Sequence, residues 1–277
     1  MLGFRGWSPN KKAQLLSTLA LIVLFTALGG LLSVIFAGVF LLVPDAPRAR
    51  VLPHLVSFAT GALLGAALLA LIPEALERAG MGGAYGIGMA LVAGIVLFFI
   101  LEKLVLWRHS HSGEYADHGA HHAHHEHREQ ASAVLVIIGD SIHNALDGVL
   151  IAAAFLTDVK LGIVTSIAVM THEIPQEIGD FAVLLHSGMS RTRALALNLL
   201  TSLTSMIGGV IGYFALARSM DMLPYAIAVA AACFLYVAVA DLIPGLHRRV
   251  RPSESVAQVL LITLGLVVIA VAEQHAH

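Results

Sequence analysis

The chain has 277 residues, of which 58% are hydrophobic and 12% are charged, and its mean hydropathy is +0.84. A typical soluble domain has about 25% charged residues, so the composition excludes a soluble globular protein and indicates a polytopic membrane protein. The formal net charge of −2 excludes the basic surface that nucleic-acid binding requires. A single cysteine, Cys233, excludes a disulfide framework and a thiolate zinc cluster. Against so few charges, 15 histidines are many.

Eight apolar segments are long enough to cross a membrane as helices, since a hydrocarbon core of about 30 Å needs roughly 20 helical residues. The first segment is too long for a signal-peptide core of about 7–15 residues, so we expect it to be retained. The fourth and fifth contain charged residues, but these fall on one face of each helix. The predicted spans are 15–43, 55–76, 84–106, 134–156, 161–186, 194–217, 225–246 and 256–272.

The loops between these spans predict an orientation. Eight spans place both termini on one side, where the loops carry six Lys and Arg residues, against ten on the other side. Because cytoplasmic loops are richer in Lys and Arg, we expect both termini outside a cell membrane (inner or plasma) and the loop between spans 3 and 4 in the cytoplasm. No segment is left for a separate soluble domain, so residues 1–277 are expected to form a single transmembrane domain.

A short motif occurs near the ends of two spans. Span 2 ends with Leu71-Ile72-Pro73, and span 7 ends with Leu242-Ile243-Pro244. The two spans run in opposite directions in the predicted topology, which is the pattern of an inverted-repeat transporter. Chance recurrence in a leucine-rich chain is the alternative.

Spans 4 and 5 carry ionisable residues at membrane depth, where charge is most costly and usually functional. In span 4, polar residues recur at the i, i+3, i+4 and i+7 spacing of one helical face: Asp140, His143, Asn144 and Asp147. In span 5, a similar face carries His172, Glu173, Gln176, Glu177 and Asp180. A structural hydrogen-bond network would normally use one or two Ser, Thr or Asn residues, and a proton relay is the other alternative. So many carboxylates favour a bound cation.

Imidazole and carboxylate ligands together favour a divalent transition metal such as Zn²⁺, Fe²⁺, Mn²⁺ or Cd²⁺. The i, i+4 spacing lets His143 and Asp147 reach one ion, and His172 and Gln176 have the same spacing. The residue after each histidine is rotated by about 100° and could serve a neighbouring ion. These two residues are Asn144 and Glu173. A two-metal centre is therefore plausible, with Asp147 as the bridging ligand.

Two further residue types shape the predicted site. Pro175 cannot donate to the carbonyl of Thr171, so we expect it to kink span 5. Gly148 and Gly179 are expected to let neighbouring helices approach closely.

The polar segment 107–133 between spans 3 and 4 is predicted to be a flexible cytoplasmic loop. Eight of the 15 histidines lie in it, interleaved with acidic residues, which is typical of flexible metal binding. A histidine expression tag would be terminal and regular, so this internal, irregular segment is not a tag. A pH-sensitive linker is the alternative interpretation. The eight histidines are His109, His111, His118, His121, His122, His124, His125 and His127.

The motif H-N-x-x-D-G in span 4, followed by H-E-x-P-x-E-x-G-D in span 5, resembles the ZIP (Zrt/Irt-like) metal transporters. The second motif is most similar to the histidine-rich LIV branch, as is F-L-Y-V-A-V-A-D in span 7. The resemblance implies an all-α protein with eight spans in a 3+2+3 arrangement with inverted repeats, and cation import toward the cytoplasm. It implies a binuclear centre in which one position is lined by His143, Asp147, His172 and Gln176. The other position would be lined by Asn144, Asp147 and Glu173.

The chain departs from the family pattern in ways that weaken the second metal position. The LIV branch usually has His, and many bacterial relatives have Glu, where this chain has Gln176. A neutral amide bridges two cations less well than a carboxylate. Span 6 has no carboxylate, and its polar candidates are Asn198, Ser202 and Ser205.

The sequence thus predicts a divalent-metal importer and no enzyme, with zinc as the favoured substrate. Its expected partners are the lipid bilayer and metal ions, without nucleic acid, and a homodimer stays open. Accessory groups along the pathway would be Asp140, Glu177, Asp180 and Asp241, although Asp241 could equally be an interface carboxylate.

Two other functions compete with this prediction. A zinc exporter of another family usually has six spans and a folded cytosolic domain, which this chain lacks. An intramembrane metalloprotease would need H-E-x-x-H, but the second histidine is replaced by Gln176 and a proline interrupts the motif.

Overall fold

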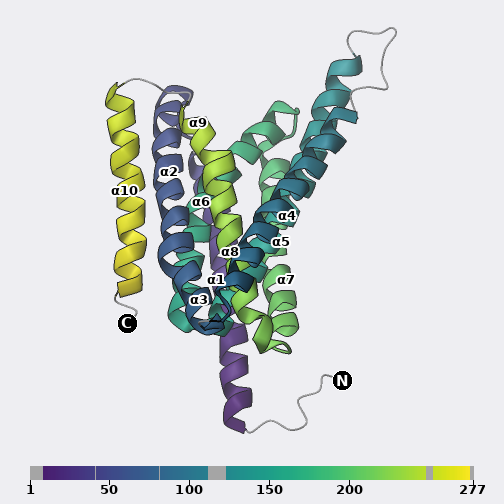
Figure 1. Ribbon diagram of the computed structural model, residues 1–277. Coiled ribbons are helices and arrows are strands. Elements are labelled where there is room, and N and C mark those ends of the chain that lie inside the picture. Colours follow the sequence, from purple (N-terminus) through teal and green to yellow (C-terminus); the bar gives the residue numbers. More distant parts are fainter. Residues whose placement is uncertain (1–8, 41, 81, 112–122, 248–251, 275–277) are drawn as a thin grey trace.

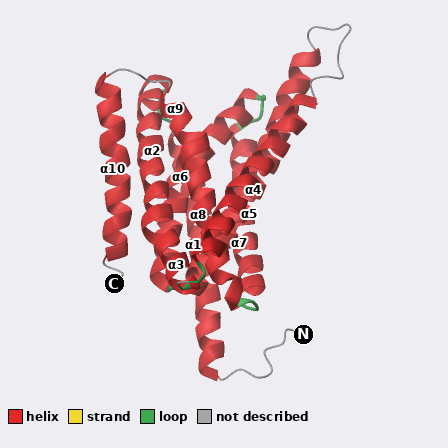
Figure 2. Cartoon of the chain, in the orientation of Figure 1, coloured by secondary structure: helices red, strands yellow, loops and turns green. Residues whose placement is uncertain are grey.

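The computed structural model describes residues 9–40, 42–80, 82–111, 123–247 and 252–274. Throughout this part of the chain the regular structure is helical, without strands (Figure 2). The helices are α1 Pro9–Phe40, α2 Asp45–Gly65, α3 Ile72–Ala79, α4 Ala84–His111, α5 Ala123–Thr157, α6 Val159–His186, α7 Arg191–Leu216, α8 Leu223–Tyr236, α9 Ile243–His247 and α10 Pro252–Gln274. Two π-helical segments, η1 Ala66–Leu71 and η3 Val237–Leu242, and a 3₁₀ turn, η2 Met220–Met222, complete the order.

Seven stretches of helix are long and apolar enough to cross a membrane. They are Leu15–Phe40, Arg50–Ala79, Ala84–Lys103, Val136–Thr157, Arg191–Leu216, Met220–His247 and Ser253–Gln274. The remaining predicted span is α6, which has 28 residues and a length of about 42 Å. Its polar face lowers its hydropathy, but it packs among α1, α2 and α5. The predicted all-α polytopic fold is confirmed.

The helices run in alternating directions through one bundle (Figure 1). In this view, α1 begins and α10 ends toward the lower end, whereas α4 ends and α5 begins at the upper end. The described ends nearest the two termini therefore lie opposite the connection between spans 3 and 4. This agrees with an even number of crossings.

Spans 2 and 7 share an unusual local geometry. In each, a π-helical segment comes directly before the Ile-Pro pair of the repeated motif. The N–H of Ile72 donates to Ala67 O, and the N–H of Ile243 donates to Ala238 O, five residues back in both cases. The same distortion at the same motif in two antiparallel spans favours a true internal repeat over chance recurrence.

The packing of the outer spans has the symmetry of an inverted repeat. The three spans before α5 are α1, α2–α3 and α4, and the three after α6 are α7, α8–α9 and α10. The second span of the first group, α2, packs on the third span of the last group, α10. The third span of the first group, α4, packs on the second span of the last group, α8. This exchange is what two inverted halves around a central pair would produce.

Glycine lets α5 and α7 touch at backbone distance. A Cβ on Gly148 would lie 1.8 Å from Ser205 O, and one on Gly208 would lie 1.9 Å from Ala145 O. By contrast, nothing lies within 4 Å of a Cβ built on Gly179, which is exposed. The prediction of close helix approach is therefore confirmed at Gly148 and wrong at Gly179.

Helical structure extends into both ends of the predicted 107–133 loop. Helix α4 continues to His111 and α5 begins at Ala123. Residues 112–122, with three of the eight predicted loop histidines (His118, His121 and His122), lie outside the described residues. For the other five the structure describes only the backbone. Metal binding by this segment stays a prediction.

Candidate metal site

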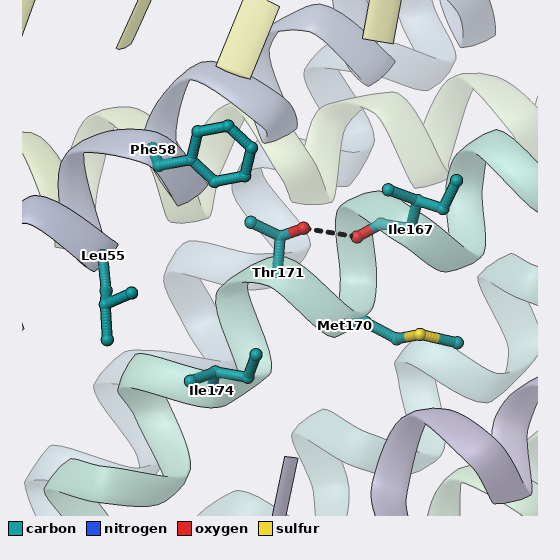
Figure 3. A pocket seen from close by; sticks show the side chains of 6 residues that line it. All are labelled: Leu55, Phe58, Ile167, Met170, Thr171 and Ile174. Carbon is teal, nitrogen blue, oxygen red and sulfur yellow. Dashed lines mark hydrogen bonds between the residues drawn. The ribbon is translucent and has the colours of Figure 1, made fainter. Parts of the chain in front are cut away.

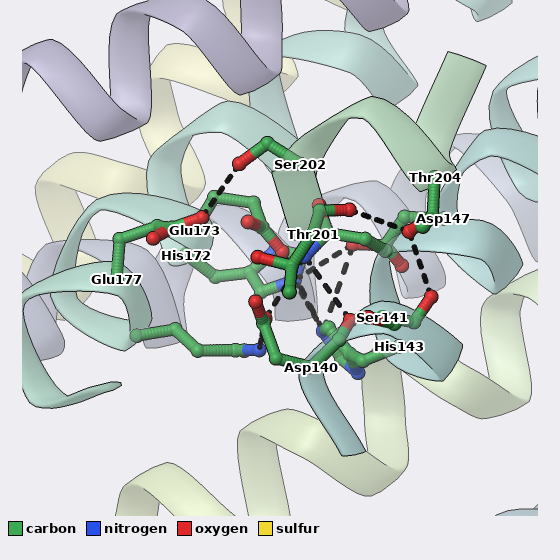
Figure 4. A network of polar contacts seen from close by, with 12 residues as sticks. Asp140, Ser141, His143, Asp147, His172, Glu173, Glu177, Thr201, Ser202 and Thr204 are labelled. Atoms are coloured by element: carbon green, nitrogen blue, oxygen red, sulfur yellow. Dashed lines mark hydrogen bonds and ion pairs between the residues drawn. The ribbon is translucent and has the colours of Figure 1, made fainter. Parts of the chain in front are cut away.

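Four of the predicted ligands converge between α5 and α6. One donor atom from each of His143, Asp147, His172 and Glu173 lies within 4.8 Å of all the others. We call these four residues the histidine cluster (Figure 4). Three of its members are 1–2% exposed, and only the side chain of His143 is more open, at 18%. Helix α6 runs on through Pro175 without a break, so both of its cluster residues belong to one continuous helix.

The spacing of the donor atoms suits one small cation. The two imidazole Nε2 atoms are 3.2 Å apart, and Asp147 Oδ2 lies 3.2 Å from His172 Nε2 and 3.6 Å from His143 Nε2. Glu173 Oε1 lies 3.7 Å from His143 Nε2 and 3.9 Å from His172 Nε2. Tetrahedral zinc with bonds of about 2.0–2.1 Å separates its ligand atoms by about 3.3–3.4 Å. The cluster is therefore close to a coordination shell.

The second ring nitrogen of His172 fixes how the imidazole is presented. His172 Nδ1 lies 3.2 Å from Ala168 O, one turn back on α6. A backbone carbonyl is an acceptor only, so Nδ1 must carry the proton in this contact. Nε2 is then left with a lone pair directed at the cluster, as in many metal-bound histidines.

The carboxylates of the histidine cluster lack hydrogen-bond donors. All four side-chain oxygens of Asp147 and Glu173 are buried and without a hydrogen-bond partner in the described part of the chain. Burying an unpaired carboxylate is very costly unless a cation compensates its charge. This is the strongest indication in the structure of a cation site.

Two other predicted ligands are hydrogen-bonded to Asp140. Asn144 Nδ2 donates to Asp140 Oδ1 at 2.9 Å and to Asp140 O at 3.2 Å, while Gln176 Nε2 donates to Asp140 Oδ1 at 3.2 Å. We call Asp140, Asn144 and Gln176 the amide cluster. The resemblance implies that Gln176 lines a position with the two histidines; in the structure its side-chain nitrogen bonds Asp140, and Glu173 lies within reach of both imidazoles.

Two polar residues of α7 bond Glu177 on α6, whereas Thr204 Oγ1 donates to Ser141 O on α5 at 2.7 Å. Ser202 Oγ donates to Glu177 Oε1 at 2.7 Å, and Asn198 Nδ2 donates to Glu177 O at 3.3 Å. Glu177 is fully buried, whereas Asp180 is half-buried and Asp241 lies exposed in η3. These acidic residues do not belong to the histidine cluster, and their role as accessory positions stays a prediction.

The sequence did not predict a contact between α4 and α8. The hydroxyl of Tyr236 donates to Glu102 Oε2. Glu102 lies beside Lys103 near the end of span 3, and a charged pair is typical of a membrane edge. The position of Glu102 therefore gave no reason to expect Tyr236 as its partner. Tyr236 belongs to the motif of span 7, and that was the one available signal.

An apolar pocket of about 270 Å³ lies beside the site, between α2 and α6 (Figure 3). The hydroxyl of Thr171, its one polar side chain, donates to Ile167 O on the same helix at 2.6 Å. The pocket therefore offers no carboxylate or imidazole ligand to a cation. Its lining residues are Leu55, Phe58, Ile167, Met170, Thr171 and Ile174.

Comparison with known proteins identifies the family. The family model described as ZIP zinc transporter matches residues 13–273. Zinc transporter ZIP13 of Pongo abelii is 33% identical over 231 residues, covering 78% of this chain and 65% of that protein. Zinc transporter ZIP4 of Mus musculus is 33% identical over 273 residues, covering 76% and 40%. Zinc transporter foi of Drosophila melanogaster is 42% identical over 136 residues, covering 49% and 19%.

The chain thus spans less than two thirds of the length of each of these three relatives. The matched region nevertheless includes every described helix that bears a site residue. The chain belongs to the ZIP zinc transporter family.

Proposed function

We propose that this protein moves divalent transition-metal cations, zinc foremost, across the membrane toward the cytoplasm through the histidine cluster. The observation that carries the proposal is the set of four unpaired, buried carboxylate oxygens beside two imidazole nitrogens. The metal is the substrate. Cd²⁺, Fe²⁺ and Mn²⁺ accept the same ligand types and are expected to compete with zinc.

Charge balance favours a divalent cation. Two carboxylates and two neutral imidazoles around one M²⁺ form a neutral unit, which lowers the cost of holding the ion in a low-dielectric bundle. A monovalent ion would leave one negative charge uncompensated. The absence of thiolate ligands in the cluster suits a carrier, which must release what it binds.

The order of acidic residues supports a release route toward the upper end of the bundle in Figure 1. Helix α6 rises to that end, so Glu177 and Asp180 follow Glu173 along it. Asp241, in η3 near the same end, would be a later station. With the Lys and Arg bias of the loops, we assign this end to the cytoplasm and both termini to the outside.

The competing functions lose support from the family assignment. Members of this family are transporters and not enzymes, so the metalloprotease interpretation falls. An exporter of another family falls for the same reason. The histidine-rich segment, by the topology just proposed, would meet ions on the cytoplasmic face.

The test is zinc uptake into proteoliposomes with a pH gradient. His172→Ala and Asp147→Ala each remove a donor from the centre of the cluster, and uptake is expected to fall to background in both. His54→Ala is the matched control, because His54 is exposed on α2 and contacts only Arg50 O, at 2.7 Å, among the described contacts. Uptake at the wild-type rate in both cluster variants would refute the site.

A further inference from the structure

We propose that this transporter holds one cation at a time between α5 and α6, because the hydrogen bonds of the amide cluster engage groups that a second metal position would need. The inference rests on the proposed function and adds the number of ions carried per cycle. It separates this chain from the binuclear arrangement that its motifs imply.

Asp140 is the carboxylate that engages Asn144, a residue predicted to line the second position, and one of its oxygens is saturated. A carboxylate oxygen offers about two lone pairs. Oδ1 accepts one hydrogen bond from Asn144 at 2.9 Å and one from Gln176 at 3.2 Å. A cation at this oxygen would have to displace both donors.

The two amides are fixed by this arrangement. Asn144 directs its side-chain nitrogen at Asp140 twice, to Oδ1 and to the backbone oxygen, so both of its N–H groups are used. Gln176 makes its bond across the interface from α6 to α5. Amide N–H groups carry partial positive charge, so the two amides weaken the attraction of Asp140 Oδ1 for a cation. The surroundings of Asp147 and Glu173, which lack donors, attract one.

No second group of His, Cys, Asp and Glu ligands converges elsewhere in the described residues. The histidine cluster is the one group there in which three or more His, Cys, Asp or Glu side chains bring donor atoms within 4.8 Å of one another. Glu177 Oε1 is occupied by Ser202, which leaves Glu177 Oε2 as a single unpaired oxygen. One oxygen is too few for a metal site. Helix α7 adds hydroxyl and amide groups but no carboxylate.

The amide cluster then has a positioning role. The bond between Gln176 and Asp140 ties α5 to α6 one turn away from His143 and Glu173. It therefore helps to set the distance between the halves of the histidine cluster. Gln176 is the residue that decides the number of ions, because Glu at this position would supply a charge and release a lone pair of Asp140.

The experiment counts bound zinc by elemental analysis of the purified full-length protein, as the difference between wild type and Asp147→Ala. The difference cancels zinc held by the histidine-rich segment. We expect a difference of one ion per chain. His172→Ala serves as a second variant if Asp147→Ala fails to fold, which thermal unfolding of each protein will show.

The other outcomes separate the two proposals. A difference of two ions would overturn the single-ion inference and leave the proposed function standing. A difference of zero in both variants would overturn the proposed function itself. Zinc transport by the wild type is measured in parallel, which shows that the reference protein is folded and active.

A second comparison tests the role assigned to Gln176. Gln176→Glu is expected to raise the zinc count by one ion per chain. Gln258→Glu, on α10, adds the same charge where the side chain bonds only Leu246 O among the described contacts, at 3.3 Å, and is expected to leave the count unchanged. An unchanged count in Gln176→Glu would overturn the claim that this amide excludes the second ion.

Discussion

The histidine cluster and the amide cluster occupy the same helix interface and are built from similar parts. Each combines buried carboxylate with nitrogen-bearing side chains from α5 and α6, one helical turn apart. They differ in whether the carboxylate oxygens receive hydrogen bonds. Asp140 Oδ1 has two donors, whereas the oxygens of Asp147 and Glu173 have none. If the histidine cluster binds a cation as proposed, then the hydrogen-bond partners of a buried carboxylate, and not its presence alone, distinguish a cation site from a structural network.

The energetics of burial explain why this difference matters. A buried carboxylate with its hydrogen bonds made is tolerated, but one left unpaired bears the full cost of desolvation. In a membrane no water compensates along the lipid-facing surface. Under the proposed function, a bound cation would offset the cost of burying the carboxylates of the histidine cluster.

The largest expected effect comes from exchanging one carboxylate for an amide in each environment. Glu173→Gln removes a charge from the histidine cluster and is expected to raise the KM for zinc uptake by more than about 100-fold. This effect is larger than the loss of a residue that only orients a metal ligand would cause. Glu177→Gln, one turn along α6, makes the same change where Ser202 already satisfies an oxygen. It is expected to change KM by no more than a few-fold. Equal effects of the two variants would break the comparison between the clusters.

Much of the site could be predicted from the sequence because helical geometry fixes which residues share a face. The i, i+4 spacing placed His143 and Asp147 together, and the structure confirms their approach. The spacing could not show which α6 residue completes the cluster. That depends on the rotation of α6 against α5, which brings Glu173 inward and turns Gln176 toward Asp140.

The fold was predictable at the level of spans and less so in their contacts. Long apolar runs identify helices that cross a membrane, and the repeated Leu-Ile-Pro motif indicated inverted halves. The π-helical geometry before each motif was not predictable, because it depends on packing as well as on proline. Gly179 shows the same limit: a glycine in a span permits close approach but does not say that a neighbour is there.

A smaller effect is expected from the packing that holds α5 in place. Gly148→Ala would bring a Cβ to 1.8 Å from Ser205 O on α7, so the helices must separate. We expect a loss of about 3 kcal/mol in stability, at the upper end for overpacking. We also expect reduced uptake, because Asp147 directly precedes Gly148 on α5. Gly179→Ala meets nothing within 4 Å and is expected to change stability by at most about 1 kcal/mol. Thermal unfolding in detergent measures both, and a similar loss in the two variants would contradict the assigned contact.

The smallest expected effect comes from removing the hydrogen-bond donor of the Glu177 carboxylate. Ser202→Ala removes the 2.7 Å hydrogen bond from α7 to Glu177, and hydrogen bonds between membrane helices contribute about 0.6 kcal/mol on average. We therefore expect a fall of about 2 °C in Tm with an unchanged zinc count. Ser166→Ala is the matched control, since Ser166 is equally buried but donates within its own helix to Gly162 O. Loss of bound zinc in Ser202→Ala but not in Ser166→Ala would link the Glu177 carboxylate to the ion and erase the distinction between the two environments.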